Sequence, residues 1–386
     1  MSLRIAMVVD PWSLPFNGTV VSTRRFIFAL AASGFRIRVL AIDADPAVDS
    51  AAFQRLSIPG FNRIINTMRA PLARPERSKL RAALQDCDVV HVQFPFFLGH
   101  AAIGEAKRMG IPVVCSFHVQ PENILLNLGV TSRFMRNLLY RFFTARFFNR
   151  ADSVVVPSEF GARMLREHGV ESPVHVISNG VPAEFFDVPE TAGEDDRFRV
   201  LSIGRLAPEK QHEVLLRAVA QSRFSDRIEL TLAGAGPREE RLRRLAAALG
   251  IEVRIGFFEE ADLLRLLGSA DLVVHTSTIE LEGMSVTEAM AAGKVVVVSD
   301  APDSACADLV VEPRERFRVG DVEDLSERID YWLSHPREKL EQGTANRRAA
   351  KQLSHPQSVK KLADIYRALC GVSESVHIER QQHRGV

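Results

Sequence analysis

Two glutamates eight residues apart, Glu280 and Glu288, bracket the stretch with the clearest chemical potential. It reads Glu-Leu-Glu-Gly-Met-Ser-Val-Thr-Glu and follows residues 270–275, an apolar run that predicts a buried strand. The second glutamate opens the helical run at residues 288–293, so the order is strand, loop, helix. Free N–H groups at a helix start attract phosphate, and carboxylates accept hydrogen bonds from diols. The pattern suits a ligand with a sugar, a diphosphate and a ribose. It is equally consistent with no ligand, in which case Glu288 interacts with the helix dipole and Glu280 is a solvated acid of the loop.

Two other loops could approach such a ligand. The first follows a predicted strand and holds Gly204, Arg205 and Lys210. Two cations at a strand end can neutralise a diphosphate, and a glycine permits close backbone approach. The second loop holds Gly234 and Gly236 and could pass close to a nucleoside. Taken alone, each loop is also typical of an ordinary turn with solvated side chains.

Gly18 and His118 are the candidates in the first half of the chain. Gly18 lies in a loop between a predicted strand and a predicted helix, another possible anion site. This single glycine is not a Gly-x-Gly-x-x-Gly motif, so a nicotinamide-dependent dehydrogenase is not supported. His118 directly follows the strand predicted at residues 113–117, where parallel sheets place their ligands. It could bind a hydroxyl or carry a proton, although a lone histidine at such a place is more often structural.

Apolar strand runs alternate with helical stretches in both halves of the chain. Such alternation predicts parallel α/β sheets that are covered on both faces. The predicted strands are residues 4–10, 37–42, 89–92, 113–117, 153–156, 175–177, 200–203, 228–233, 253–255, 272–275 and 295–298. The strand and helix pattern stops at residues 182–198, a polar, acidic stretch with two prolines that indicates a linker. For 386 residues we expect two α/β domains (1–183 and 198–355), a linker (184–197), a crossover helix (356–372) and a flexible tail (373–386).

Composition excludes several classes of protein. The four cysteines are far apart and form no Cys-x-x-Cys pair, which argues against structural zinc and a disulfide framework and favours a reducing compartment. No apolar run reaches the roughly 18 residues of a spanning helix. The first residues enter a strand pattern at once, so we expect no signal peptide.

Charge is distributed unevenly. Residues 1–185 hold 21 Lys and Arg against 14 Asp and Glu, and the remainder is acidic. Residues 59–81 hold six basic residues and one acid. Residues 124–150 hold five arginines, five phenylalanines and no acid, which is typical of an amphipathic helix at an anionic membrane surface. The membrane or acceptor candidates there are Arg133, Arg136, Arg141, Phe142 and Arg146. A core helix with snorkelling arginines is the alternative, and no nucleic-acid module is recognisable.

Together these motifs resemble the family 4 retaining glycosyltransferases, which have the two-Rossmann-domain GT-B fold. The resemblance runs from about Arg4 to Leu369 and adds Ser116-Phe-His118, Val156-Pro-Ser158 and Ile177-Ser-Asn179-Gly180-Val181 to the loops above. It implies two Rossmann-like domains facing across a cleft and a C-terminal helix that crosses back to the N-terminal domain. Asn17 departs from the family, where a second glycine is common, and Leu281-Glu282-Gly283-Met284 replaces the commoner Gly-Phe-Gly. The extra acid Glu282 leaves the donor sugar open.

The resemblance also implies residue roles. The catalytic set is His118 near the reacting centre, Arg205 and Lys210 at the departing diphosphate, and Glu280 at donor-sugar hydroxyls. Backbone amides of Gly283, Met284 and Ser285 would assist at the phosphates or sugar, and Glu288 would bind the ribose. Gly18, Gly204, Gly234 and Gly236 complete the donor-binding set. No Asp-x-Asp motif lies in a suitable place, so we expect no metal and no cofactor other than a nucleotide-sugar co-substrate.

For the acceptor, residues 17–23, 88–92 and 116–118 resemble the diacylglycerol glycosyltransferases of bacterial membranes. This implies hexosyl transfer from UDP-glucose, or else UDP-glucuronate or UDP-galactose, to diacylglycerol by a cytoplasmic enzyme bound peripherally to the inner face of the cell membrane. A glycosyltransferase of polysaccharide or lipopolysaccharide assembly, with a carbohydrate acceptor, is the main alternative. A nucleotide-sugar epimerase and a catalytically inactive sensor are less consistent with Arg205, Lys210, Glu280 and Glu288. The sequence does not fix the oligomeric state.

Overall fold

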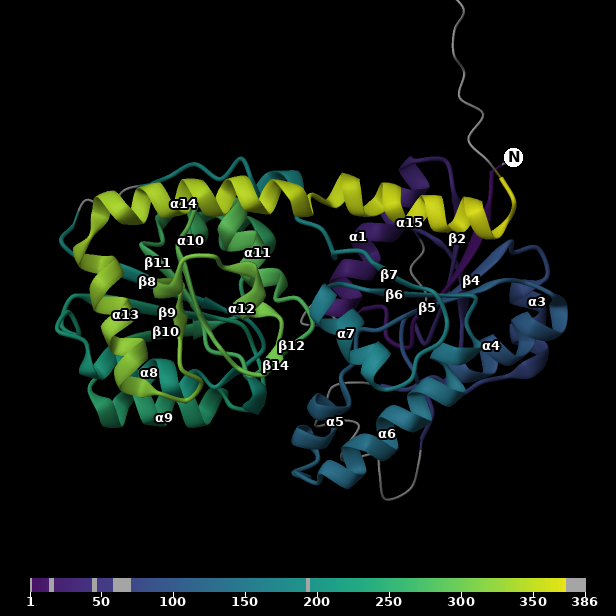
Figure 1. Cartoon of the computed structure of the whole chain (residues 1–386), viewed down its shortest axis with the longest axis horizontal. Helices are drawn as coiled ribbons and strands as arrows, with labels where there is room; N and C mark the ends of the chain where they lie inside the picture. Colours follow the sequence, from purple (N-terminus) through teal and green to yellow (C-terminus); the bar gives the residue numbers. More distant parts are fainter. Residues whose placement is uncertain (1, 14–16, 44–46, 58–70, 192–194, 373–386) are drawn as a thin grey trace, which may run out of the picture.

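The chain forms two α/β domains side by side, as the computed structural model shows (Figure 1). The structure describes residues 2–13, 17–43, 47–57, 71–191 and 195–372. The predicted tail at residues 373–386 and residues 59–70 of the basic segment lie outside the described residues.

The N-terminal domain is built on a parallel sheet with the strand order β3-β2-β1-β4-β5-β6-β7. Its strands are β1 (Arg4–Val8), β2 (Arg36–Ala41), β3 (Asp49–Ala52), β4 (Val89–Val92), β5 (Val113–Ser116), β6 (Ser153–Val156) and β7 (Val174–Val176). Its helices are α1 (Gly18–Ala32), α3 (Arg77–Leu84), α4 (Phe97–Met109), α5 (Pro121–Asn127), α6 (Arg133–Arg146) and α7 (Glu159–Glu167). The segment predicted as one amphipathic stretch is thus two helices, α5 and α6, which hang below the sheet in Figure 1.

The C-terminal domain is also built on a parallel sheet, with the strand order β10-β9-β8-β11-β13-β15. Its strands are β8 (Phe198–Ile203), β9 (Ile228–Ala233), β10 (Val253–Gly256), β11 (Leu272–His275), β13 (Val296–Ser299) and β15 (Arg316–Phe317). A separate parallel pair joins β12 (Ile279–Glu280) and β14 (Asp303–Ser304). The helices are α8 (His212–Gln221), α9 (Glu239–Leu249), α10 (Glu260–Ser269), α11 (Met284–Ala291), α12 (Cys306–Leu309), α13 (Val322–Ser334) and α14 (Pro336–Ala350).

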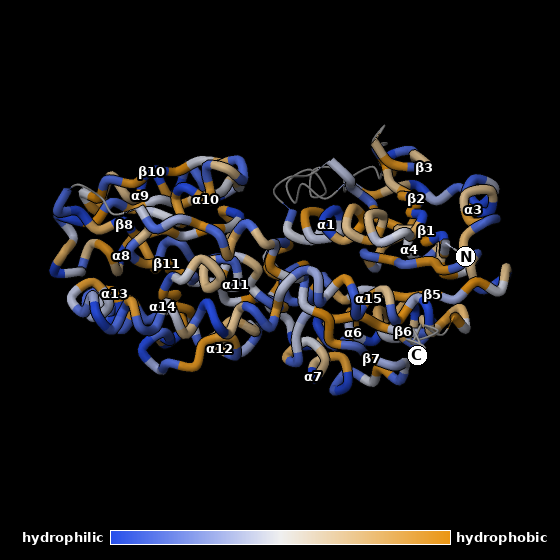
Figure 2. Tube along the Cα trace, turned by 90° about the horizontal axis from the view of Figure 1, so that it is seen from above, coloured by the Kyte–Doolittle hydropathy of each residue, from blue (hydrophilic) through white to orange (hydrophobic). Residues whose placement is uncertain are grey.

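The central strands are buried on both faces, which is why they read as unbroken apolar runs. All four residues of β4, β5, β6, β11 and β13 are buried. In Figure 2 the hydrophobic parts of the trace run through the interior of both domains, beneath more hydrophilic helices. This arrangement confirms the predicted fold class. Strand β3 was not predicted because its sequence, Asp-Ser-Ala-Ala, contains no β-branched or aromatic residue.

The chain passes between the domains twice at the same place. On the way out, the Val181 N–H donates to the Leu353 carbonyl at 2.8 Å, and on the way back the His355 N–H donates to the Val181 carbonyl at 2.9 Å. The last helix, α15 (His355–Leu369), then packs against the N-terminal domain, and Val359, Leu362, Ala363 and Tyr366 join its core. Figure 1 shows α14 and α15 running end to end over the two domains. The predicted crossover is therefore present.

Helix α11 begins at Met284, one turn earlier than the sequence pattern indicated. Its N-cap, Gly283, has φ 84°, a left-handed conformation that favours glycine. A Cβ on Gly283 would also lie 2.5 Å from the Cys306 sulfur. Glu288 therefore sits in the second turn of the helix, and the free N–H groups of the first turn belong to residues around Met284 and Ser285.

Candidate active site

Lys210 and Glu280 form an ion pair at the carboxyl edge of the C-terminal sheet. The Lys210 Nζ donates to the Glu280 Oε1, and both side chains are 17% exposed. The His275 Nε2 lies 3.1 Å from the same oxygen. Burial acts to raise the pKa of Glu280, but the Lys210 ammonium and then His275 outweigh it and hold that pKa well below its usual range. Glu280 is thus a firmly ionised acceptor for hydroxyl groups.

The loop that carries Lys210 is fixed by unusual backbone geometry. The Thr276 hydroxyl donates to the Lys210 carbonyl at 2.6 Å. The next residue, Gln211, has φ 51° and is the one non-glycine residue with a positive φ in the described ranges. A left-handed non-glycine residue costs about 1–2 kcal/mol. Such strain is retained where the surroundings dictate it, and here it occurs directly after Lys210.

Gly234 and Gly236 let their loop meet the loop of Gly204 without side chains between the two backbones. A Cβ on Gly234 would lie 1.9 Å from the Gly204 carbonyl oxygen, and one on Gly236 would lie 2.3 Å from the Leu206 carbonyl oxygen. Gly204 itself has φ 152° and lies against the Lys210 side chain. The structure thus brings these predicted donor residues together.

Arg205 reaches across to the N-terminal domain. Its Nη2 donates to the Asn127 Oδ1 at 3.2 Å, at the end of α5. The guanidinium remains able to bind a second acceptor, because it has five N–H donors in a planar fork. Arg205 and Lys210 therefore lie on one loop and already have protein partners in this structure.

Gly18 and the start of α11 face each other from opposite domains. A Cβ on Gly18 would lie 3.7 Å from the Met284 sulfur. Gly18 is the first residue of α1, and Asn17 caps that helix by accepting from the Thr19 N–H at 3.0 Å. Beside Met284, the Ser285 hydroxyl lies 3.4 Å from the His275 Nδ1. Two helix starts with positive dipole ends thus converge on the space between the domains.

Glu288, the candidate ribose ligand, is paired with an arginine from the other domain. The Arg25 Nη1 on α1 donates to the Glu288 Oε1 at 2.8 Å, and the Arg25 Nη2 lies 3.1 Å from Glu260. Burial raises the pKa of Glu288, and Arg25 opposes that shift. Arg25 was not among the sequence candidates.

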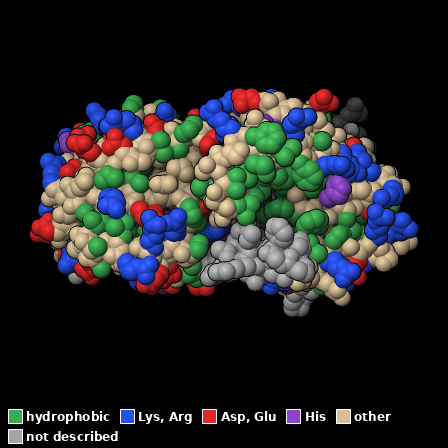
Figure 3. Space-filling model, turned by 90° about the horizontal axis from the view of Figure 1, so that it is seen from below, with side chains coloured by type: hydrophobic (Ala, Val, Ile, Leu, Met, Phe, Trp, Pro, Cys, Tyr) green, Lys and Arg blue, Asp and Glu red, His purple; other side chains and the backbone are tan. Residues whose placement is uncertain are grey.

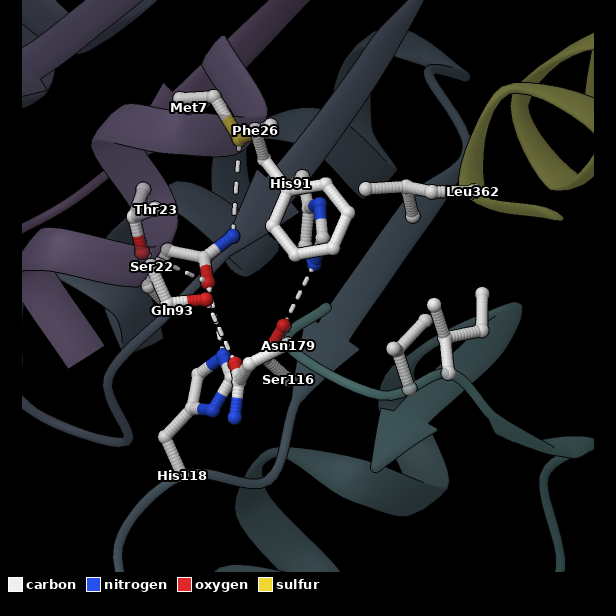
Figure 4. A pocket seen from close by; sticks show the side chains of 12 residues that line it. Met7, Ser22, Thr23, Phe26, His91, Gln93, Ser116, His118, Asn179 and Leu362 are labelled. Atoms are coloured by element: carbon white, nitrogen blue, oxygen red, sulfur yellow. Dashed lines mark hydrogen bonds between the residues drawn. The ribbon is translucent and has the colours of Figure 1, made fainter. Parts of the chain in front are cut away.

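His118 lines a small cavity of the N-terminal domain that has both polar and apolar walls (Figure 4). Its Nε2 is 3.1 Å from the Gln93 Oε1, which also accepts from the Thr23 hydroxyl at 3.4 Å. Because that oxygen can only accept, the Nε2 carries the proton and the Nδ1 is left as an acceptor. Burial lowers the pKa of His118 to about 4, so its imidazole is neutral at physiological pH. Its Nδ1 can accept a hydrogen bond from a hydroxyl group, but the ring supplies no positive charge.

Glu282 turns to the N-terminal domain. It is 4% exposed, and its carboxylate accepts from the Asn179 N–H at 3.0 Å and from the Asn179 Nδ2 at 2.5 Å. Next to it, the Ser158 hydroxyl donates to the Leu281 carbonyl. The extra acid is thus bound by protein groups across the domain interface.

The membrane candidates on α6 do not all lie on its exposed surface. Arg133, Arg141, Phe142 and Arg146 are exposed, whereas Arg136 lies 3.7 Å from the Glu122 carboxylate and faces the protein. Phe134, Leu138 and Phe142 recur every four residues and are 74%, 49% and 49% exposed. No sequence signal marks Arg25 and Asn127, since each acts through a contact with a residue far along the chain. Asn179 lies in a motif of the family resemblance, but its contact with Glu282 was not predicted.

Two observations bear on membranes and metals. None of the described helices is long and apolar enough to cross a membrane. Within the described ranges, no group of three or more His, Cys, Asp or Glu side chains is arranged to hold a metal ion.

Comparisons with known proteins cover nearly the whole chain. Residues 16–185 match Glycosyltransferase Family 4, and residues 185–350 match glycosyl transferases group 1. Alpha-monoglucosyldiacylglycerol synthase of Streptococcus pneumoniae is 24% identical over 78% of this chain and 72% of its own length. GDP-mannose-dependent alpha-mannosyltransferase of Mycolicibacterium smegmatis is 29% identical over 96% of this chain and 98% of its own length. The structure of Anabaena Alr3699/HepE in complex with UDP-glucose superimposes with a TM-score of 0.75 at 18% identity, over 95% of this chain and 100% of that one.

Proposed function

Because this chain belongs to the family 4 glycosyltransferases and has their two-domain fold, we propose that it transfers a hexosyl group with retention of configuration from a nucleotide sugar to a membrane lipid. The proposed acceptor is diacylglycerol and the first proposed donor is UDP-glucose. The proposed location is peripheral, on the inner face of the cell membrane.

The exposed stripe of α6, namely Phe134, Leu138 and Phe142, is the observation that carries the lipid acceptor. Large apolar side chains are rarely exposed in a row on a soluble surface, and a row flanked by cations suits the boundary of an anionic bilayer. Arg133, Arg141 and Arg146 are exposed on the same helix. Figure 3 shows hydrophobic side chains gathered on the underside of the molecule, where Figure 1 places α5 and α6.

A buried apolar cluster lies near His118 at the same edge of the N-terminal sheet. It comprises Val9, Val20 and Phe94, with Phe96 and Val119 packed against them. These residues follow or adjoin the carboxyl ends of strands β1, β4 and β5, where ligands of parallel sheets bind. The Phe94 and Phe96 rings stack with their centroids 5.8 Å apart.

The proposed chemistry uses the charges of the C-terminal domain. As the bond between the anomeric carbon and the diphosphate breaks, negative charge grows on the leaving oxygen, and Lys210 and Arg205 stabilise it. The acceptor hydroxyl attacks from the same face and passes its proton to the leaving phosphate. Glu280 accepts from donor-sugar hydroxyls, the neutral His118 accepts from another, and Glu288 binds the ribose. Closure of the two domains excludes water from the reacting groups.

The relatives support two donors. The Streptococcus protein is named as a monoglucosyldiacylglycerol synthase, which agrees with a lipid acceptor and a glucosyl donor. The Mycolicibacterium protein is named as a GDP-mannose-dependent mannosyltransferase and matches more of the chain. Transfer from GDP-mannose is therefore the second candidate.

A matrix of donors and acceptors tests the proposal. Purified protein is incubated with UDP-glucose, UDP-galactose, UDP-glucuronate and GDP-mannose, each with diacylglycerol in mixed micelles or with soluble sugars. We expect a glycolipid whose anomeric configuration, determined by NMR, matches that of the donor. Transfer to soluble sugars alone would contradict the lipid acceptor, and an inverted product would contradict retention.

Vesicle flotation tests the α6 surface separately. The wild type should float with vesicles that contain anionic phospholipid, and Phe134→Ser with Phe142→Ser should reduce the bound fraction at least tenfold. Leu340→Ser is the matched control, because Leu340 is 63% exposed on the C-terminal domain. Equal flotation of both variants would show that α6 is not the contact surface.

A further inference from the structure

Glu282 is a buried carboxylate in the donor loop whose side chain is bound by the other domain. It lies between β12, which ends at Glu280, and α11, which starts at Met284. Both of its oxygens accept from the Asn179 N–H, at 3.2 and 3.0 Å, and the second also accepts from the Asn179 Nδ2 at 2.5 Å. No Lys or Arg forms an ion pair with it among the residues that the structure describes. Burying a carboxylate without a cation is costly, so this contact calls for a role beyond stability.

The contact continues from Asn179 into the cavity of His118. The Asn179 Oδ1 accepts from the Ser22 hydroxyl at 2.6 Å. Ser22, Asn179 and His118 all line that cavity, and Figure 4 shows Asn179 beside His118. A continuous chain of hydrogen bonds thus joins Glu282 in the donor loop to Ser22 on α1. The loop that holds Glu280 is thereby set against the wall that holds His118.

Asn179 also stands directly before the place where the chain crosses between domains. Gly180 has φ 77°, and a Cβ there would lie 2.5 Å from the His355 Cα. Val181 then pairs with residues on either side of Ser354. The backbone next to Asn179 is therefore constrained, so a side chain that hydrogen-bonds to Asn179 is held in a fixed position.

We propose that Glu282 is a positioning residue for glycosyl transfer, which acts by holding the donor loop against Asn179 and so brings Glu280 and His118 to the same substrate. It touches neither the nucleotide nor the reacting atoms. The closed arrangement of the two domains is what it stabilises, and nucleotide binding to the C-terminal domain does not require it. The inference rests on the proposed glycosyl transfer but is independent of the acceptor, since it concerns only the donor loop and the opposing wall.

The carboxylate and the amide can be swapped between positions 282 and 179 by substitution, which gives a direct test. In Glu282→Gln one of the two acceptor oxygens becomes an NH₂ group, which then faces an Asn179 donor, either its backbone N–H or its side-chain NH₂. In Asn179→Asp two carboxylates face each other. In the double variant the amide introduced at position 282 can donate to the carboxylate introduced at position 179, so the contact is restored with its polarity reversed. We expect each single variant to lower kcat at least tenfold, and the double variant to recover to within about threefold of the wild type.

Nucleotide release from the sugar donor gives kcat, and calorimetric titration gives the affinity for the free nucleoside diphosphate. We expect that affinity to stay within about threefold of the wild type in all three variants. Glu315→Gln is the matched control, because Glu315 is a buried carboxylate hydrogen-bonded to Asn346 inside the C-terminal domain. It should leave kcat unchanged.

Three results would overturn the proposal: single variants with normal kcat, a double variant as slow as Asn179→Asp, or a loss of nucleotide affinity equal to the loss of kcat. A wild-type protein that transfers no sugar from any nucleotide donor would instead count against the proposed function itself. If a variant at position 179 or 282 fails to fold, Ser22→Ala provides a second test, because it breaks the same chain one bond further on. Its kcat should fall with nucleotide affinity preserved, and a normal kcat would contradict the proposed connection.

Discussion

Removing Lys210 tests the proposed role of charge at the leaving group most directly. If its ammonium stabilises the developing negative charge, Lys210→Ala loses about 3–4 kcal/mol of transition-state stabilisation, or roughly a hundredfold to a thousandfold in kcat. A second effect comes from the structure. Lys210 is the cation that holds Glu280 ionised, and both side chains are only 17% exposed. Breaking a largely buried pair from one side costs roughly 3–5 kcal/mol of stability.

The two effects separate in a double variant. Glu280→Gln removes the unpaired charge that Lys210→Ala leaves behind, so the double variant should regain much of the lost stability. It should regain no turnover, because the leaving group still has no ammonium beside it. The assay is kcat from nucleotide release, together with urea unfolding of each variant. A Lys210→Ala enzyme within threefold of the wild-type kcat would refute the reasoning, and recovery of turnover in the double variant would show that Lys210 acts only through Glu280.

Three further outcomes follow from backbone geometry and burial. Gly234→Ala should lower nucleotide affinity at least tenfold, because its Cβ would overlap the Gly204 carbonyl. Gly256→Ala is the control and should leave the affinity unchanged, because its Cβ meets nothing within 4 Å. Calorimetric titration with the nucleoside diphosphate measures the affinity of both variants. Gln211→Gly should raise the free energy of unfolding by about 0.5–1 kcal/mol. Glycine relieves the left-handed strain, but it also raises the entropy of the unfolded chain, which offsets part of the gain. An unchanged urea midpoint would contradict this prediction. Burial raises the pKa of Glu315 from 4.5 to about 7, so its contribution to stability is largest below pH 4.5 and is lost as pH rises through 7. The loss is on the order of 3 kcal/mol, and Glu315→Gln should remove this part of the pH dependence of unfolding.

The sheets and the donor loops were predictable because their signals are local. Buried parallel strands appear in the sequence as apolar β-branched runs, and each predicted run coincides with a strand. Gly204, Gly234 and Gly236 stand where the loops meet backbone to backbone, which only glycine allows. The start of α11 was placed one turn late because a glycine N-cap leaves no side-chain signature, whereas Glu288 looks like a first-turn acid.

The cross-domain partners were not predictable from spacing. Arg25 lies 263 residues from Glu288, and Asn179 lies 103 residues from Glu282. In the sequence Arg25 is one of two adjacent arginines in an amphipathic helix, and nothing local distinguishes it from Arg24. In the sequence Glu282 was an extra acid that left the donor sugar open, and its contact with Asn179 could not be predicted because the direction of a loop side chain depends on the packing of the other domain. Such contacts appear only when the two sheets are placed relative to each other.

The return of the last helix to the first domain has a consequence for the order of folding. Residues 198–350 of the C-terminal domain are contiguous, so its core can form as soon as they have left the ribosome. The N-terminal domain precedes the C-terminal domain in the chain, but it lacks Val359, Leu362 and Tyr366 until α15 has been synthesised. An apolar face over strands β1 and β4 therefore stays uncovered while the whole C-terminal domain is translated. Ribosome-bound chains that stop before residue 355 should expose that face to chaperones, and full-length chains should not.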